Sequence, residues 1–450
     1  MKRITVFSFA LFLSGAMYAQ FVLDYLKGAD EYFAKGDYAS AAEYYEKSLG
    51  KSKDGGKKVF SPYTPQNISK KSSRTVTTTE EMAKYRLAEC YRLLNYPSKA
   101  EPYYKEVMIA ANKDFPLAQY HYAAQLRALG KYAESEQNFR SFLSGYSNND
   151  EYKKNAEREL KNLQFIQQQM NRKDLKRYTI NKAGNTLNTT GASYAPAWLN
   201  ENTLLFTSTR PLDTTAKAKE YTNRVYQAAI ESGAVNSVSL TAIPQEKGMQ
   251  QGVAGLAPDG NTMYLTKWAV SGEKKLSAIY TSNKTNDGWS EPAKLGTAIN
   301  AEGSNNQQPF VTPDGRYLLF SSNREGGLGG YDLWYAPVDN GIPGTSINMG
   351  SVINTGYDEQ APSYHAVSGN LVFSSNGRVG MGGYDFFQSK GSIGKWSEPV
   401  NMGYPVNSVK DDIYFVSSGS AKNMLENVML SSDREASCCL ELFSLSKSDR

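Results

Sequence analysis

The spacing of apolar residues divides this chain into two parts. Up to about residue 171, apolar side chains recur every three or four positions, as at Leu26, Ala29 and Phe33, which is the spacing of amphipathic helices. From about residue 177 onward, short alternating apolar runs are separated by Gly, Pro, Asn and Asp, the pattern of β-strands and turns. The sequence therefore predicts a multidomain protein, a helical part followed by an all-β part.

The helical pattern repeats along the chain. Ala88 and Ala123 occupy equivalent places in successive copies and are 35 positions apart, close to the tetratricopeptide period of about 34 residues. Three such repeats and a capping helix predict a tetratricopeptide α-solenoid over residues 20–172. A basic loop rich in Ser and Thr interrupts it at 51–78. This loop is either a solvated segment or a docking arm for an acidic partner or an anionic surface.

The all-β part contains a repeated stretch. Phe320-Ser321-Ser322-Asn323 corresponds to Phe373-Ser374-Ser375-Asn376, and Gly330-Tyr331-Asp332 corresponds to Gly383-Tyr384-Asp385, with an offset of 53 residues in both cases. Each copy has the pattern of four short antiparallel strands, which bury both faces only by stacking around an axis, as in a propeller. We expect the glycines to form a tight turn with positive φ, and the Asp to bond the local backbone.

Five copies can be traced, but the copy nearest the C-terminus is incomplete. It lacks the closing strand that ends in Ile-Asn or Val-Asn in the other copies. A matching segment, RYTINKAGNTLN at 177–188, precedes the first copy instead. We therefore expect this N-terminal strand to complete the C-terminal blade. The result is an all-β five-bladed propeller over residues 173–450, with two fewer exposed sheet edges.

Residues 1–19 have the features of a cleavable signal peptide. Lys2 and Arg3 precede an apolar run over residues 4–13, and small residues follow it. The apolar run is too short to cross a bilayer, and no other run in the chain is long enough. We therefore expect an exported, periplasmic protein without a transmembrane segment, associated with the outer membrane or free of it. The net charge of +5 is small for 450 residues and does not indicate nucleic-acid binding.

Few residues suited to catalysis or metal binding are present. The chain has two histidines, His121 and His365, neither in a metal-ligand cluster, and it lacks the common metalloprotease, phosphate-loop and nucleophile motifs. Cys90 is expected to be a buried helix residue. Cys438 and Cys439 are either two packed thiols or a strained disulfide. We therefore predict no enzymatic activity, no metal and no cofactor.

The repeated Pro-Asp-Gly, Phe-Ser-Ser-Asn and Gly-Gly-Tyr-Asp motifs resemble the PD-type propeller repeats of the TolB family. Tetratricopeptide repeats ahead of such a propeller resemble the N-terminal part of Bacteroidota envelope proteins of the PorE/OmpA-family type. Some members of that group serve the type IX secretion system, and the resemblance implies such a link here. An OmpA-like peptidoglycan-binding domain normally follows in that family. The present chain stops at Arg450, so direct peptidoglycan binding is not carried over.

The leading hypothesis is a non-enzymatic periplasmic scaffold of the cell envelope. It would bind envelope or secretion-system proteins through the tetratricopeptide groove and the propeller face. Five candidate contacts on the concave helices are chosen by position: Tyr32, Tyr85, Arg92, Tyr120 and Arg127. The alternative is a sensor or carrier that binds a small ligand or a glycan in the propeller channel, near the polar blade start at 305–308. A hydrolase related to propeller peptidases would need a catalytic domain that the sequence lacks.

Overall fold

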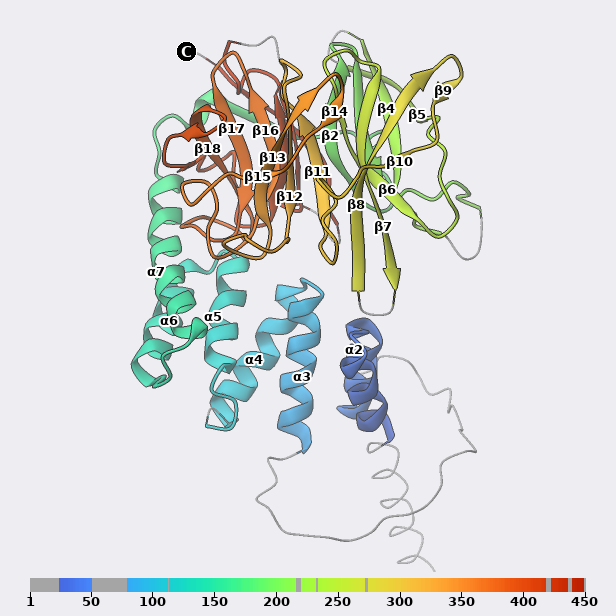
Figure 1. Ribbon diagram of the computed structural model, residues 1–450. Coiled ribbons are helices and arrows are strands. Elements are labelled where there is room, and N and C mark those ends of the chain that lie inside the picture. The colour runs from blue at the N-terminus through green and yellow to red at the C-terminus, as the bar shows by residue number, and fades with distance from the viewer. Residues whose placement is uncertain are drawn as a thin grey trace, which may run out of the picture. The chain divides into compact units, whose positions relative to one another are not determined.

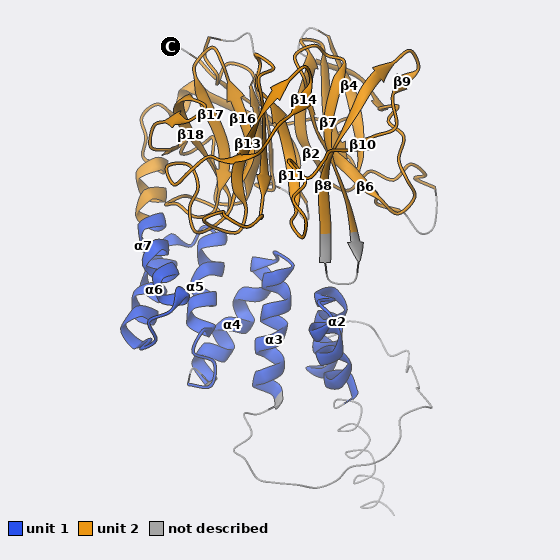
Figure 2. Ribbon diagram, in the orientation of Figure 1, with its two compact units in different colours: residues 1–163 blue, residues 164–450 orange. Residues whose placement is uncertain are grey.

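The structure, a computed structural model, describes residues 24–50, 79–111, 113–215, 220–231, 234–271, 274–417, 422–435 and 439–448. The predicted signal peptide, the basic loop at 51–78 and Cys438 lie outside these ranges. The chain forms two compact units, one ending at Leu163 and the other beginning at Gln164 (Figure 2). The division falls within helix α7 (Glu151–Met170).

The first unit is helical. A helix over residues 24–34 is followed by five more before α7, which are α2 (Tyr38–Ser48), α3 (Thr79–Leu93), α4 (Pro97–Ala111), α5 (Ala118–Ala128) and α6 (Tyr132–Gly145). From α2 to α6, each helix packs on the next one in the chain. Ala88 and Ala123 are fully buried, which lets neighbouring backbones approach closely, and Cys90 is buried as predicted. Within the described residues, no helix combines the length and the apolar character needed to cross a bilayer.

The second unit is a five-bladed β-propeller, as predicted (Figure 1). Three blades are continuous in sequence and have the same plan. Each has a first strand, a second strand that forms a hairpin with it, a third strand and two short outer strands. The three blades are β6 (Gln250–Leu256), β7 (Thr262–Ser271), β8 (Lys274–Thr285), β9 (Gly288–Trp289) and β10 (Ala293–Lys294); β11 (Asn306–Val311), β12 (Tyr317–Ser322), β13 (Asp332–Asp339), β14 (Ile342–Pro343) and β15 (Ile347–Asn348); and β16 (Glu359–His365), β17 (Asn370–Ser375), β18 (Asp385–Ser392), β19 (Lys395–Trp396) and β20 (Val400–Asn401).

The other two blades flank the point where the ring closes. One contains β2 (Ser193–Asn200), β3 (Thr203–Ser208), β4 (Arg224–Glu231) and β5 (Ala234–Leu240). The other contains β21 (Asp412–Ser417), β22 (Val428–Ser432) and β23 (Glu441–Lys447), and β1 (Tyr178–Lys182) completes it. β1 pairs antiparallel with β23, from Tyr178 opposite Lys447 to Lys182 opposite Phe443. The predicted ring closure is therefore confirmed.

The core of the propeller lies between adjacent blades. Phe320 of one blade packs with Tyr264 and Ile279 of the blade before it. Phe373 packs in the same way with Leu319 and Leu333. Each blade thus covers one face of its neighbour, so a blade is stable only within the closed ring.

The Gly-Gly-Tyr-Asp turns confirm the role predicted for their aspartates. Asp332 accepts hydrogen bonds from the backbone nitrogens of Leu328 (2.6 Å) and Gly329 (3.1 Å). Asp385 makes the corresponding bonds one blade later, to the backbone nitrogens of residues 381 and 382. These aspartate side chains hold the turn in place by accepting hydrogen bonds from its backbone N–H groups.

The sequence predicts that the glycines of this turn have positive φ, which is correct for Gly326 and wrong for Gly329 and Gly382. Gly326 has a φ of +85°. Gly329 and Gly382 do not adopt positive φ, but a Cβ at either would collide with a backbone carbonyl oxygen, that of Tyr357 or Lys410 respectively. These two glycines are needed because the turn approaches the backbone that leads into the next blade.

Candidate binding site

Three of the residues chosen from the sequence are tyrosines that pack within the helical unit. The Tyr32 ring lies 5.1 Å from the Tyr44 ring, and Tyr85 stacks on Phe115 at 4.7 Å between ring centroids. Tyr120 contacts several aromatic rings, which are Phe139, Phe142, Tyr152 and His121. These contacts give all three tyrosines a packing role.

The two arginines form ion pairs within the same unit. Arg92 donates to Glu89 at 2.6 Å, and Arg127 lies 2.9 Å from Glu159. Glu89 is also 3.7 Å from His121, whose pKa burial lowers to about 4, against the opposing effect of the Glu89 carboxylate. The structure therefore gathers Arg92 and Tyr120 around the Glu89–His121 contact, whereas Tyr32 packs elsewhere. A role for these residues in binding a partner stays a prediction.

A cavity of about 310 Å³ lies where the first strands of all five blades meet. Each of these strands (β2, β6, β11, β16 and β21) contributes to the wall. Its large side chains come from different blades and include Trp198, Leu256, Phe310, Tyr364 and Tyr414. Because every blade contributes, the cavity belongs to the axis of the propeller, and we call it the axial cavity.

Each of the five strands carries a β-bulge at the same level. The register shifts there, and one non-glycine residue per strand has positive φ: Ala195 (51°), Val253 (51°), Gln308 (60°), Ala361 (52°) and Tyr414 (61°). In every first strand, the lining of the axial cavity begins at this residue. Residues other than glycine rarely adopt this conformation, and such strain is concentrated at functional sites.

Hydrogen bonds between blades lie at the level where the lining of the axial cavity begins. Gln308 Oε1 accepts from the backbone nitrogen of Ala361 at 2.9 Å. Gln308 Nε2 donates to Gln360 Oε1 at 3.0 Å and to the Tyr414 hydroxyl at 3.1 Å. The Tyr414 ring lies 5.7 Å from the Tyr194 ring, which adds a fourth blade. We call these five residues the floor of the cavity.

The axial cavity carries no acidic or basic side chain apart from a histidine, as far as its described lining shows. Its polar side chains carry the Gln308 amide, several hydroxyls and the His365 imidazole, whose Nδ1 lies 2.9 Å from Ser368 Oγ. Burial raises the pKa of Tyr414 to about 12, against the opposing effect of the Gln308 hydrogen bond. The Tyr414 hydroxyl therefore stays protonated and neutral. The cavity can pack against apolar surface and exchange a few neutral hydrogen bonds.

Sequence reasoning found only part of this site. The sequence predicts the polar blade start at 305–308 near the channel, and Gln308 is part of the floor. Trp198, Phe310 and Tyr364 were missed as wall residues. The available signal was the proline that recurs in three first strands, Pro196, Pro309 and Pro362, all of which line the cavity.

No protein-family model matches the chain, and no curated protein matches it. Solved structures do match part of the chain. The endo-arabinase of Bacteroides thetaiotaomicron is 16% identical over 60% of this chain and 98% of that chain, with a TM-score of 0.39. The catalytic domain of a Coprinopsis cinerea GH62 α-L-arabinofuranosidase is 11% identical over 61% and 97%, also at 0.39. An α-L-arabinofuranosidase from Lactobacillus brevis is 11% identical over 60% and 95%, again at 0.39.

These matches contradict two expectations from the sequence, a non-enzymatic scaffold and the absence of enzymatic activity, because the matched proteins are glycosidases. The lack of a local catalytic motif in the sequence is no evidence against glycosidase activity. The two carboxyl groups that such an enzyme uses can come from different blades, far apart in the sequence. At 11–16% identity and a TM-score of 0.39, the likeness concerns the fold and assigns no substrate. The comparisons give no support to the resemblance to PorE/OmpA-family proteins, which stays a prediction.

Proposed function

We propose that the axial cavity binds a small uncharged ligand, and that this ligand is a neutral glycan. The observation that carries the proposal is the cavity itself, which all five blades build without an acidic or basic side chain other than His365 among its described lining residues. Its volume of about 310 Å³ is at the lower end of the range for ligand sites, about 300–1,000 Å³. It suits one or two sugar rings.

The wall chemistry fits a neutral sugar. A sugar ring has apolar faces and a rim of hydroxyls. The lining includes the aromatic residues Trp198, Phe310 and Tyr364, and Gln308 and Tyr414 bring neutral polar groups to it. A charged ligand would lose its hydration without finding an opposite charge, which is costly.

Binding is the function proposed for this cavity because hydrolysis would need further groups. Most glycoside hydrolases use two carboxyl groups, about 5–9.5 Å apart, on either side of the bond that is cleaved. None of the described residues lining the axial cavity is Asp or Glu.

Calorimetric titration tests the proposal. The protein would be titrated with neutral arabino-, xylo-, gluco- and galacto-oligosaccharides, and with uronic-acid oligosaccharides as charged comparators. Ala366→Trp places a large ring at a lining position that is exposed, and we expect it to weaken binding at least tenfold. Val367→Trp is the matched control, since Val367 is 57% exposed and does not line the cavity. If no neutral oligosaccharide binds, or if the two variants bind equally well, the proposal is wrong.

We also propose that the helical unit is a tetratricopeptide α-solenoid and that the chain is exported. The first point is supported by the consecutive packing of its helices and by the burial of the equivalent residues Ala88 and Ala123. The second rests on residues 1–19 alone, so periplasmic location stays a prediction, as does contact of the helical unit with an envelope partner.

A further inference from the structure

We infer that the axial cavity is blind, and that the Tyr414 hydroxyl at its floor recognises the terminal residue of a neutral glycan chain. This inference rests on the proposed function and adds to it the part of the ligand that is recognised. A blind cavity admits a chain end, whereas a through-channel or an open groove admits the interior of a chain.

The floor closes the axis through bonds that join four blades. Gln308 bridges from β11 to Ala361 and Gln360 on β16 and to Tyr414 on β21. Tyr414 then packs against Tyr194 on β2. None of the residues that line the axial cavity comes before the bulge residue in its first strand.

The polar network continues beyond the floor, on the side away from the cavity. Gln360 Nε2 donates to the Tyr384 hydroxyl at 3.0 Å, and Tyr384 donates to Asp358 Oδ2 at 2.8 Å. The Tyr194 hydroxyl donates to Asn223 at 2.7 Å. These bonds fix the positions of Gln360 and Tyr194 in the floor. The floor is therefore formed by several residues bonded to the blades, and not by one side chain that lies across an opening.

Among the floor residues that line the cavity, which are Gln308, Ala361 and Tyr414, the hydrogen bonds leave one donor available to a ligand. Both donors of the Gln308 amide have acceptors, Gln360 and Tyr414. The Tyr414 oxygen accepts the bond from Gln308, but its own proton has no acceptor among the described residues. A half-buried hydroxyl proton without an acceptor is unfavourable, and a ligand oxygen that reaches the floor would supply one.

This available donor defines the group at the inner end of the ligand. It must be an uncharged acceptor, such as a hydroxyl or a ring oxygen of the terminal sugar. The apolar wall above the floor then surrounds that sugar, and the rest of the chain extends out of the cavity.

The first test is a matched pair of Tyr→Phe variants. Tyr414→Phe removes the available donor, whereas Tyr264→Phe removes a hydroxyl that donates to Gly341 O and that belongs neither to the lining nor to the floor. With the neutral oligosaccharide that the wild type binds best, we expect Tyr414→Phe to lower affinity about tenfold and Tyr264→Phe to leave it unchanged. Equal affinity of Tyr414→Phe and the wild type would overturn the inference and leave the proposed function standing.

The second test uses the wild type alone, so it does not depend on the folding of a variant. A size series of the same linear neutral glycan is titrated, and the number of protein molecules bound per chain is measured. Recognition of a chain end predicts one protein per chain at every length. A number that rises with length would overturn the inference. If no neutral glycan binds at all, the proposed function itself is wrong.

Discussion

Asn188 and Leu442 are 254 positions apart in the sequence, yet the side-chain amide of Asn188 pairs with both backbone polar groups of Leu442. Asn188 Nδ2 donates to Leu442 O at 2.9 Å, and Leu442 N donates to Asn188 Oδ1 at 2.8 Å. We call this pair of hydrogen bonds the asparagine clamp. The same clamp occurs in each of the three continuous blades, where an asparagine after the last strand bonds the backbone of a residue in the third strand. The pairs are Asn300 with Ile279, Asn354 with Leu333, and Asn407 with Phe386. The ring is therefore closed by the contact that the continuous blades use internally.

Loss of this clamp is expected to destabilise the propeller at its closure. Asn188→Ala leaves the buried N–H of Leu442 without its acceptor, whereas Leu442 O keeps the bond from the Ala183 N–H, so the free energy of unfolding should fall by about 1–3 kcal/mol. Asn300→Ala, which removes the same clamp inside a continuous blade, should cost a similar amount. Urea denaturation measures both. Hydrogen exchange in β1 and β23 should rise only in Asn188→Ala, and equal protection of β1 in the two variants would contradict this account.

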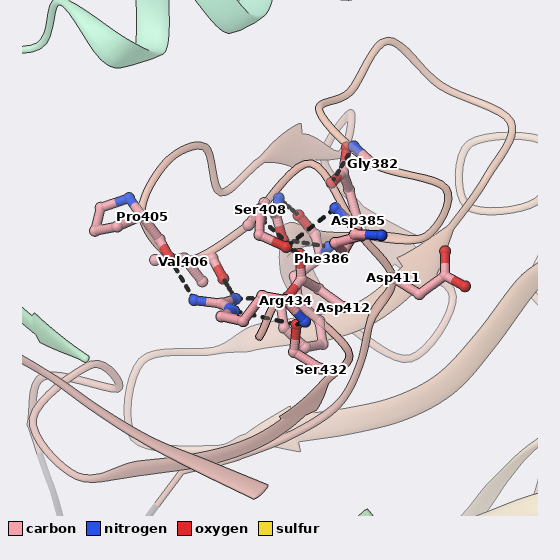
Figure 3. A network of polar contacts seen from close by, with 12 residues as sticks. Gly382, Asp385, Phe386, Pro405, Val406, Ser408, Asp411, Asp412, Ser432 and Arg434 are labelled. Atoms are coloured by element: carbon pink, nitrogen blue, oxygen red, sulfur yellow. Dashed lines mark hydrogen bonds and ion pairs between the residues drawn. The ribbon is translucent and has the colours of Figure 1, made fainter. Parts of the chain in front are cut away.

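Arg434 should matter more to stability than its counterpart Arg324. The Arg434 guanidinium donates to the carbonyl oxygens of Pro405 and Val406 and to the carboxylate of Asp412, which is fully buried (Figure 3). Arg434→Ala leaves the Asp412 charge without its cation, which should cost about 3–5 kcal/mol.

Arg324 makes the equivalent contacts to Ile299 and to Asn306, a neutral side chain. Arg324→Ala should therefore cost about 1–3 kcal/mol. The double variant Arg434→Ala with Asp412→Asn should recover part of the loss, because the buried charge is gone. Equal losses in the two single variants, measured by urea denaturation, would show that the charge of Asp412 does not matter.

The stability of the propeller should fall as pH rises toward neutrality. Burial, together with the nearby Asp412 carboxylate, raises the pKa of Asp385 from 3.8 to about 7. The folded state therefore keeps a proton that the unfolded chain has lost. This contribution is fully present below pH 3.8, and it is lost as pH rises through about 7.

Asp385→Asn should remove this dependence on pH. Between pH 5 and pH 8, the free energy of unfolding of the wild type should fall by about 1–3 kcal/mol more than that of the variant. Asp332→Asn, the same change in the preceding blade, controls for the bonds to the turn. The account fails if the wild type and Asp385→Asn lose the same stability over this range.

The parts of the fold that the sequence predicted are those that a local motif encodes. The turn around Asp332 and the closing strand before Asn188 recur with the same residues, so alignment of the copies was enough to place them. The axial cavity could not be predicted in this way, because each blade contributes a different side chain, such as Trp198 or Tyr414. The left-handed bulges also leave no sequence sign, since none of them falls on glycine.

The bulges should carry measurable strain, and Ala361 is the simplest place to measure it. Glycine adopts a φ of 52° without strain, so Ala361→Gly should relieve backbone strain. This gain in stability should roughly offset the loss from the missing buried methyl group and from the greater entropy of the unfolded chain. The free energy of unfolding should change by less than about 1 kcal/mol. Ala336 is a fully buried alanine in β13 without positive φ, and Ala336→Gly should cost about 1–2 kcal/mol. Equal losses in urea denaturation would mean that the left-handed backbone at the cavity floor stores no strain.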